Sequence, residues 1–327
     1  MPRATIRTIA WLGCLLALLA QVQAGRAADY PDRPVTLVTA FASGGPSDLL
    51  ARIVGQKLSE ILRQPFVVDP RPGGGANIAA EYVARATPDG YTLLMGNNSI
   101  LATNMSLYKK LSYDAQRDFA PISMVGTQAN ILVVGPKIHA GTMAELIAFA
   151  KANPGQLNYG SSGYGTAAHL SAELFKKEAG VDIVMVPYKG SAPALQDLMG
   201  GRVDMVFATA ASVIGHIRSG TLRPLGVTTA KRTAILPEVA TIAEQGIPGF
   251  EATTWHGLVA PAGTPKDIIA ILNRATVEAL KDPAVRKALI DLGVDISSSS
   301  PEEFAAYIKS EIPKWAAVIA TAGAQVE

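Results

Sequence analysis

Residues 35–48, VTLVTAFASGGPSD, place a short apolar strand directly before a loop of glycine, serine and proline that opens a helix. Residues 157–166, LNYGSSGYGT, repeat this arrangement roughly 120 residues later. The first N–H groups of a helix have no partner inside the helix and lie at the positive end of its dipole, so each loop predicts a site for an anionic or polar group. Two such loops in one chain predict two lobes that face a shared cleft.

The first 28 residues have the order of an export signal. Arg3 and Arg7 precede an apolar stretch at residues 9–20, and small residues offer a cleavage site that we expect near Ala28. The apolar stretch is shorter than the roughly 20 residues that span a membrane, which favours a cleaved signal over an uncleaved anchor. Cys14 lies inside this stretch, so lipid modification of the N-terminus is an alternative. The sequence therefore predicts an exported protein.

The mature part of the chain has a balanced charge and no thiol. Removing residues 1–28 removes three arginines and no acid, so 29 basic and 27 acidic residues become 26 and 27. This balance argues against a nucleic-acid partner. Because Cys14 is the single cysteine, the mature chain has no disulfide, thiol catalyst or cysteine metal site. The apolar fraction of 49% over 327 residues is sufficient for two cores of ordinary size.

Strand-like apolar runs alternate with amphipathic helical stretches, which is typical of α/β folds with mainly parallel sheets. Strands are expected at residues 35–41, 66–68, 91–95, 122–125, 131–134, 157–159, 183–186, 203–207, 225–228 and 257–259. Helices are expected over residues 50–61, 143–152, 166–179 and 192–199. The part after residue 260 is predicted to be mainly helical, with Thr264 and Ser300 as helix caps and Glu303 completing a capping box.

This order of elements predicts a two-lobed protein whose chain crosses between the lobes near Thr127 and returns near Glu251. We assign residues 1–28 to the signal peptide, residues 29–127 and 252–327 to the first lobe, and residues 128–251 to the second lobe. The C-terminal helices complete the first lobe in this assignment.

Three further loops are candidates for ligand contact. Residues 72–77 (PGGGAN) and 96–99 (GNNS) follow strands, and ligands of open α/β sheets lie at the carboxyl ends of strands. Residues 187–191 (PYKGS) bring Tyr188 and Lys189 near the expected cleft. Each loop is also consistent with a plain turn. Asp48 would repel an anion, so we assign it to capping the helix or orienting the first loop.

The sequence offers little for catalysis or cofactor binding. Residues 163–168 (GYGTAA) match a loose dinucleotide pattern, but the acid about 20 residues on, Asp182, precedes its strand instead of ending it. Ser162 lacks the GxSxG elbow because Tyr164 replaces the second glycine. No Walker lysine follows the glycine loops, and the four histidines lack metal-ligand spacing. The loops are rich in donors and poor in reactive groups, so we expect no enzyme, no cofactor and no metal.

Motifs along the whole mature chain match one family of binding proteins. The matching segments are residues 30–34 (YPDRP), 41–48, 71–77, 159–170, 187–194 (PYKGSAPA), 200–204 (GGRVD) and 260–265 (APAGTP). In this order they resemble the extracytoplasmic solute-binding proteins of tripartite tricarboxylate transporters, the Bug family.

This resemblance implies a periplasmic, two-lobed fold of the Venus-flytrap kind (type II). Such a fold closes over a small solute, usually a carboxylate, and the protein delivers that solute to the membrane permease of a tripartite transporter. Carried over residue by residue, the resemblance implies these ligand-binding residues: Phe41, Ser43, Gly44, Gly45 and Ser47 on one wall, and Ser162, Gly163, Thr166 and Ala167 on the other. Asn98, Tyr188 and Thr209 are further candidates. We expect the protein to be a monomer.

The sequence departs from the family pattern at Ser47, at Gly75 and Ala76, and at Tyr164. An aromatic side chain at position 164 would stack on a ring or shield the loop. A neutral or aromatic solute therefore stays an alternative, as does a role as the ligand-sensing subunit of a signalling partner.

Overall fold

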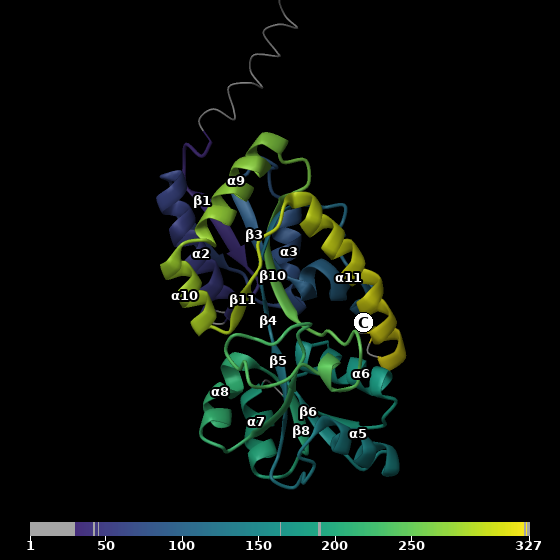
Figure 1. Cartoon of the computed structure of the whole chain (residues 1–327). Helices are drawn as coiled ribbons and strands as arrows, with labels where there is room; N and C mark the ends of the chain where they lie inside the picture. The colour runs from purple at the N-terminus through teal and green to yellow at the C-terminus, as the bar shows by residue number, and fades with distance from the viewer. Residues whose placement is uncertain are drawn as a thin grey trace, which may run out of the picture.

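The computed structural model describes residues 30–41, 43–44, 46–163, 165–188, 191–323 and 325. The expected signal peptide lies outside the described residues, as do Gly45, Tyr164 and Lys189. The described chain folds into two lobes, each built around one sheet with helices on both faces (Figure 1). Within these ranges, no helix has both the length and the apolar character needed to cross a bilayer.

The order of elements alternates strands and helices as the apolar pattern predicts. The strands are β1 (Val35–Thr39), β2 (Phe66–Pro70), β3 (Thr92–Asn97), β4 (Phe119–Gln128), β5 (Asn130–Val134), β6 (Asn158–Ser161), β7 (Val184–Pro187), β8 (Met205–Thr209), β9 (Arg223–Val227), β10 (Thr254–Pro261) and β11 (Val294–Ile296). The α-helices are α2 (Pro46–Leu62), α3 (Asn77–Ala84), α4 (Asn104–Leu107), α5 (Met143–Ala152), α6 (Ala167–Ala179), α7 (Ser191–Met199), α8 (Ala210–Arg218), α9 (Lys266–Ala279), α10 (Pro283–Asp291) and α11 (Pro301–Ala322). The 3-10 helices are η1 (Gly74–Ala76) and η3 (Ala243–Gln245), and η2 (Ser99–Thr103) is a π-helix.

The two sheets are mixed. The first has the order β11-β4-β10-β3-β1-β2, in which β1 is parallel to β2 and β3, whereas β10 is antiparallel to β3 and β4. The second has the order β7-β6-β8-β5-β9, in which β6 is parallel to β7 and β8, whereas β5 is antiparallel to β8 and β9. The expected two-lobed α/β fold is confirmed, and four strands of each sheet run in one direction: β1 to β4 in the first sheet and β6 to β9 in the second. β10 and β5 run against these strands because each enters its sheet from the other lobe.

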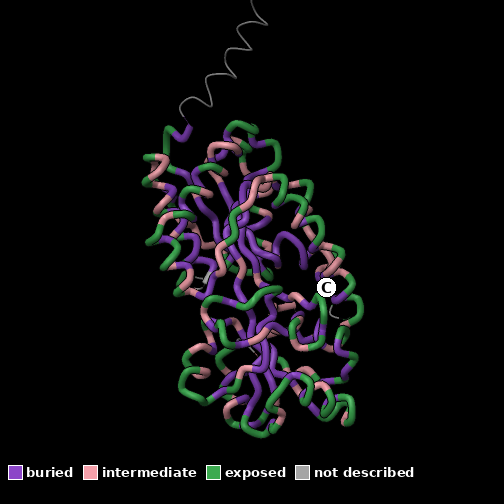
Figure 2. The backbone as a smooth tube through the Cα atoms, in the orientation of Figure 1, coloured by how far each residue is buried: buried purple, intermediate pink, exposed green. Residues whose placement is uncertain are grey.

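Helices cover both faces of the first sheet (Figure 1). On one face, Leu50, Val54 and Leu58 of α2 repeat at helical spacing and pack with α9 and α10. On the opposite face, α3 packs against β3 and β10, and the long helix α11 packs against β4. Figure 2 shows buried backbone along the sheets of both lobes and exposed backbone on the outer helices. The sheet of the first lobe therefore lies between two helical layers.

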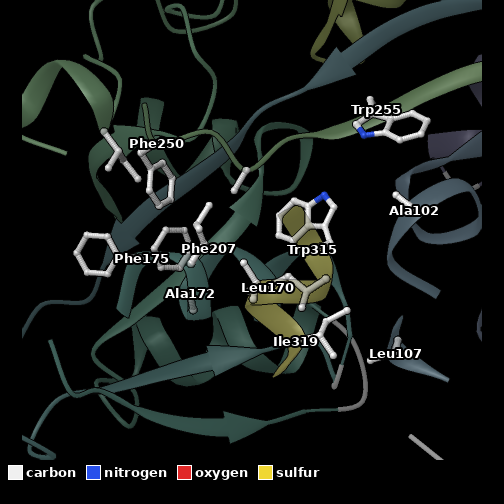
Figure 3. Close-up of a cluster of buried hydrophobic side chains, with 14 of the residues drawn as sticks. Ala102, Leu107, Leu170, Ala172, Phe175, Phe207, Phe250, Trp255, Trp315 and Ile319 are labelled. Carbon is white, nitrogen blue, oxygen red and sulfur yellow. The ribbon is translucent and has the colours of Figure 1, made fainter. Parts of the chain in front are cut away.

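The C-terminal half of α11 reaches the second lobe. Figure 3 shows Trp315 and Ile319 of α11 beside Leu170 of α6, in the same buried cluster as Phe175 and Phe207. One apolar cluster therefore continues from the first lobe into the second.

Of the two helix caps predicted in the C-terminal part, the one at Ser300 is present and the one at Thr264 is not. The capping box of α11 is confirmed: Ser300 Oγ accepts from the Glu303 N–H at 3.1 Å, and the Glu303 carboxylate accepts from the Ser300 N–H at 2.8 Å. The cap assigned to Thr264 is wrong, because its hydroxyl donates to the Pro261 carbonyl at 2.8 Å and Pro265 occupies the N-cap of α9. This part of the chain also contributes β11 to the edge of the first sheet.

Candidate functional site

A cavity of about 530 Å³ lies between the two lobes. The first lobe lines it with the loop before α2, the end of β3 with η2, and the start of β10. The second lobe lines it with the loop before α6 and the end of β8. The two glycine loops singled out in the sequence therefore face one shared space.

The structure divides the expected ligand-binding residues into three groups. Those that line the cavity are Phe41, Ser43, Ser47, Asn98, Thr166, Ala167 and Thr209. Ser162 lines a smaller cavity of about 60 Å³ that shares Ala167 and Thr209 with the first. Gly44, Gly163 and Tyr188 do not contribute to the lining of the larger cavity, and Gly45 lies outside the described residues.

Asp48 orients the first loop. One of its carboxylate oxygens accepts hydrogen bonds from the Gly44 N–H at 2.9 Å and from Arg52 Nε at 2.8 Å. The Arg52 hydrogen bonds hold the pKa of this carboxyl below its usual range. Asp48 and Arg52 therefore both stay ionised, and their opposite charges cancel. The Gly44 N–H is therefore engaged within the loop. The next donors toward the cavity are first-turn N–H groups of α2, beginning at Ser47.

The second loop is closed by its own side chains. The Thr166 hydroxyl donates to the Gly163 carbonyl at 2.8 Å and accepts from the His169 N–H at 3.3 Å, which makes Thr166 the N-cap of α6. The Gly165 N–H donates to His169 Nδ1 at 3.0 Å. Because Thr166 engages the His169 N–H, the first-turn N–H groups that this lobe offers as donors are those of Ala167 and Ala168.

Tyr188 is tied to α7 instead of to the cavity. Its hydroxyl donates to Asp197 Oδ2 at 2.8 Å, and Arg202 also pairs with Asp197. Burial, followed by the hydrogen bond with Asp197, raises the pKa of Tyr188 to about 12. The phenol is therefore neutral at physiological pH and holds the end of β7 against α7.

Gly75 allows Tyr108 to reach the cavity, and both residues line it. Gly75 has a φ of +63°, and a Cβ at this position would overlap the Tyr108 hydroxyl. The Gly75 carbonyl accepts from Asn104 Nδ2 at 2.9 Å, and Asn104 also lines the cavity. Tyr108 and Asn104 carry no local sequence signal, because only the folded chain brings them to the glycine loop.

Three polar residues on adjacent strands were also missed from the sequence. Thr254 and His256 of β10 and Gln128 of β4 line the cavity. His256 is only 2% exposed, and its Nε2 lies 3.2 Å from Gln128 Oε1. The one available signal was that Thr253, Thr254 and His256 stand directly before an apolar run.

The lining of the cavity is uncharged. Among the described residues that form it, none is lysine, arginine, aspartate or glutamate. Likewise, no three histidine, aspartate or glutamate side chains within the described ranges gather closely enough to hold a metal ion. For an anion in this cavity, the favourable electrostatic interaction would therefore come from the partial positive charge at the N-termini of α2 and α6.

His256 is expected to make the protein sensitive to acid. Burial lowers its pKa from 6.5 to about 4, so below pH 6.5 the unfolded chain binds a proton that the native chain does not. Stability is therefore lost as the pH falls from 6.5 to about 4, by roughly 3 kcal/mol at 1.36 kcal/mol per pKa unit. Urea unfolding of the wild type and of His256→Phe at pH 7.0 and 4.5 checks this, because the variant is expected to lose clearly less free energy. Equal losses in both proteins would contradict the assignment.

Comparison with known proteins places the chain in one family. The family model described as "Tripartite tricarboxylate transporter family receptor" matches residues 50–324. Protein BugT of Bordetella pertussis is 38% identical over 322 residues, which cover 98% of this chain and 99% of BugT.

Solved structures give the same result. A structure from R. palustris determined with adipate is 41% identical, with a TM-score of 0.78, and the match covers 91% of this chain and 100% of that one. MatC from Rhodopseudomonas palustris with bound malate is 32% identical, with a TM-score of 0.74, over 89% of this chain and 100% of that one. The resemblance stated from the sequence is thereby confirmed, and the chain belongs to the tripartite tricarboxylate transporter receptor family, whose members are periplasmic solute-binding receptors and not enzymes.

Proposed function

We propose that this chain captures a small carboxylate in the cavity between its lobes and delivers it to the permease subunits of a tripartite tricarboxylate-type transporter. The observation that carries the proposal is the convergence of two helix N-termini, those of α2 and α6, on one cavity without a charged side chain among its described lining residues. Each terminus contributes about 0.3 to 1 kcal/mol of favourable interaction with a negative charge. Two relatives of 41% and 32% identity were solved with adipate and malate, which supports this ligand class.

On each wall of the cavity, the proposed ligand contacts are side chains of the glycine loop and the first-turn N–H groups of the helix that follows it. On the first wall they are Ser43, Ser47 and the first-turn N–H groups of α2, with Phe41 as an apolar side. On the second wall they are Thr166, Ala167 and the first turn of α6. Gly44 and Gly163 act through the shape of the loops, because the Gly44 N–H donates to Asp48 and the Gly163 N–H donates to the Ser161 hydroxyl.

The lobes are proposed to move about two neighbouring connections. Residues 29–127 and 252–327 would form the first lobe and residues 128–251 the second. The chain passes from β4 to β5 through Ala129, and Asn130 Nδ2 donates to the Ala252 carbonyl of the returning segment at 3.3 Å. Hinges need only a few residues that change φ and ψ. We also propose that the mature chain begins after a signal peptide cleaved near Ala28 and acts as a monomer in the periplasm.

A set of carboxylates paired with their uncharged amides tests the ligand class. Adipate, succinate and malate are expected to stabilise the protein in thermal unfolding, by about 2.7 kcal/mol at a hundredfold excess over the dissociation constant. The corresponding diamides, of nearly equal shape, are expected to have little effect. Stabilisation by the amides without stabilisation by the carboxylates would contradict the proposal. Uptake of the labelled solute by cells with and without the chain then tests delivery to the permease.

A further inference from the structure

The loop at residues 73–76 has a strained backbone and borders the cavity. All four residues have a positive φ, from +57° to +123°. Ala76, with a φ of +79°, carries a Cβ that makes this conformation unfavourable. Such strain persists only where surrounding contacts fix it, and it clusters at ligand sites. Gly75 of this loop lines the cavity between the lobes, so its contacts indicate what the strained backbone positions.

Gly75 lies against the hydroxyl of Tyr108, and Asn104 holds both residues in place. A Cβ at Gly75 would overlap the Tyr108 hydroxyl. Asn104 Nδ2 donates to the Gly75 carbonyl at 2.9 Å, and the Asn104 carbonyl accepts from the Tyr108 N–H at 3.2 Å. Asn104 is only 1% exposed, so water does not compete for these hydrogen bonds. The end of the Tyr108 ring is therefore positioned beside the glycine loop.

The Tyr108 hydroxyl is available to a ligand. It forms no hydrogen bond with the residues that the structure describes, and Tyr108 Oη is not one of the enclosed, unpaired polar atoms of these residues, so it retains accessible surface. Tyr108 lines both the cavity between the lobes and a second cavity of about 250 Å³. Gly75 lines only the first of these two, so the hydroxyl end of the ring lies at the cavity between the lobes.

Tyr108 also lies where the first lobe meets the second glycine loop. The residue before it, Leu107, packs so closely on Gly165 that a Cβ at position 165 would overlap its side chain. Gly165 directly precedes Thr166, the N-cap of α6. A phenol hydroxyl is an uncharged donor, and its hydrogen bond to an ionised carboxylate is stronger than one to a neutral acceptor. Tyr108 therefore combines a suitable donor with a place near the first turn of α6.

We infer that Tyr108 is a solute-binding residue whose hydroxyl donates a hydrogen bond to a carboxylate oxygen of the solute. The inference rests on the proposed function and adds a side-chain donor to the first-turn N–H groups of α2 and α6. It also gives the glycine at position 75 a function, because the phenol reaches the solute only where no Cβ stands in its way. An uncharged donor matters here because no lysine or arginine is among the described lining residues.

Tyr108→Phe tests the inference, because it removes the hydroxyl and keeps the ring. Calorimetric titration of the mature chain at pH 7 would use adipate, succinate and malate. We expect the tightest-binding probe to bind at least about tenfold more weakly to the variant, since a hydrogen bond to a charged group is lost. Tyr82→Phe is the matched control, because Tyr82 is 40% exposed and does not line the cavity. Equal affinities of the wild type and Tyr108→Phe would overturn the inference.

A pair of glycine variants tests the position of the hydroxyl. Gly74 has a φ of +57°, close to the +63° of Gly75, but a Cβ at Gly74 would meet nothing nearer than 3.4 Å. Both substitutions carry the cost of a left-handed backbone, and only Gly75→Ala displaces the phenol. We expect Gly75→Ala to weaken binding as Tyr108→Phe does, and Gly74→Ala to bind like the wild type. Equal losses in the two glycine variants would contradict the role assigned to Gly75. If Gly75→Ala fails to fold, Tyr108→Phe still decides.

This inference and the proposed function fail in distinguishable ways. If the carboxylates bind equally well to the wild type and to Tyr108→Phe, the role of Tyr108 is refuted and the proposed function stands. If none of the probe carboxylates binds to the wild type while a neutral solute does, the proposed function is refuted and the inference with it.

Discussion

Alanine in place of Gly165 is expected to weaken solute binding about 10- to 100-fold while the unliganded chain stays folded. Gly165 lies in the loop before α6, and a Cβ there would overlap Leu107 at the end of α4 in the other lobe. Leu107 is only 4% exposed, so it cannot turn away without losing its own packing. The cheapest relief is to separate the lobes. Overpacking costs about 1 to 3 kcal/mol and every 1.4 kcal/mol is tenfold in affinity, which gives the expected range.

Gly220→Ala is the matched control for this substitution. Gly220 has a φ of +72°, close to the +70° of Gly165, and a Cβ there would meet nothing within 4 Å. Both variants therefore lose a similar amount of stability, about 1 kcal/mol, from the left-handed backbone. Only Gly165→Ala should also lose affinity in calorimetric titration with the tightest carboxylate. Equal affinities of the two variants would show that this contact between the lobes does not belong to the bound state.

The second large effect is expected at Glu311, where Glu311→Ala should lower the free energy of unfolding by about 3 to 5 kcal/mol. Glu311 is 4% exposed and accepts hydrogen bonds from the indole N–H groups of Trp255 at 3.0 Å and Trp315 at 2.8 Å. Lys314 pairs with its other oxygen at 2.8 Å. Alanine would leave two buried indole donors unpaired in the cluster that joins α11 to β10. Urea unfolding measures the loss directly.

Two companion variants make this result specific. Glu302→Ala removes an exposed carboxylate from the first turn of the same helix and should cost no more than about 1 kcal/mol. Glu311→Gln keeps an oxygen that can face both indoles but loses the ion pair with Lys314, so an intermediate loss is expected. If Glu311→Ala lowers the free energy of unfolding by no more than Glu302→Ala does, the buried carboxylate does not stabilise the helix as described.

Local sequence signals predicted the elements and the loops that face the cavity. The helix expected at residues 143–152 is α5 with the same bounds, and the capping box at Ser300 is present. Seven expected ligand-binding residues line the cavity, because strand-to-helix loops with glycine, serine and threonine have a recognisable composition. Each of these predictions depends on residues within about one helical turn of one another.

Features that depend on long-range pairing were not predictable in this way. An apolar run at residues 257–259 marks a strand but does not show that β10 returns antiparallel between β3 and β4. That pairing is what brings His256 next to Gln128, which is 128 residues earlier in the chain. The three-residue strand β11 has too little periodicity to distinguish it from the helices around it. The N–H groups proposed to contact the ligand also lie a few residues later than the sequence suggested. The reason is that Asp48 and Thr166 form hydrogen bonds with loop groups that composition alone presents as free.

We propose that the first turns of α2 and α6, one from each lobe, hold the same carboxylate. A crystal structure of the mature chain with its tightest-binding carboxylate probe would decide this. We expect the carboxylate within hydrogen-bond distance of first-turn N–H groups from both helices, at Ser47 or Asp48 on one side and at Ala167 or Ala168 on the other. A carboxylate held by one lobe alone, or a probe bound outside the cavity between the lobes, would contradict it.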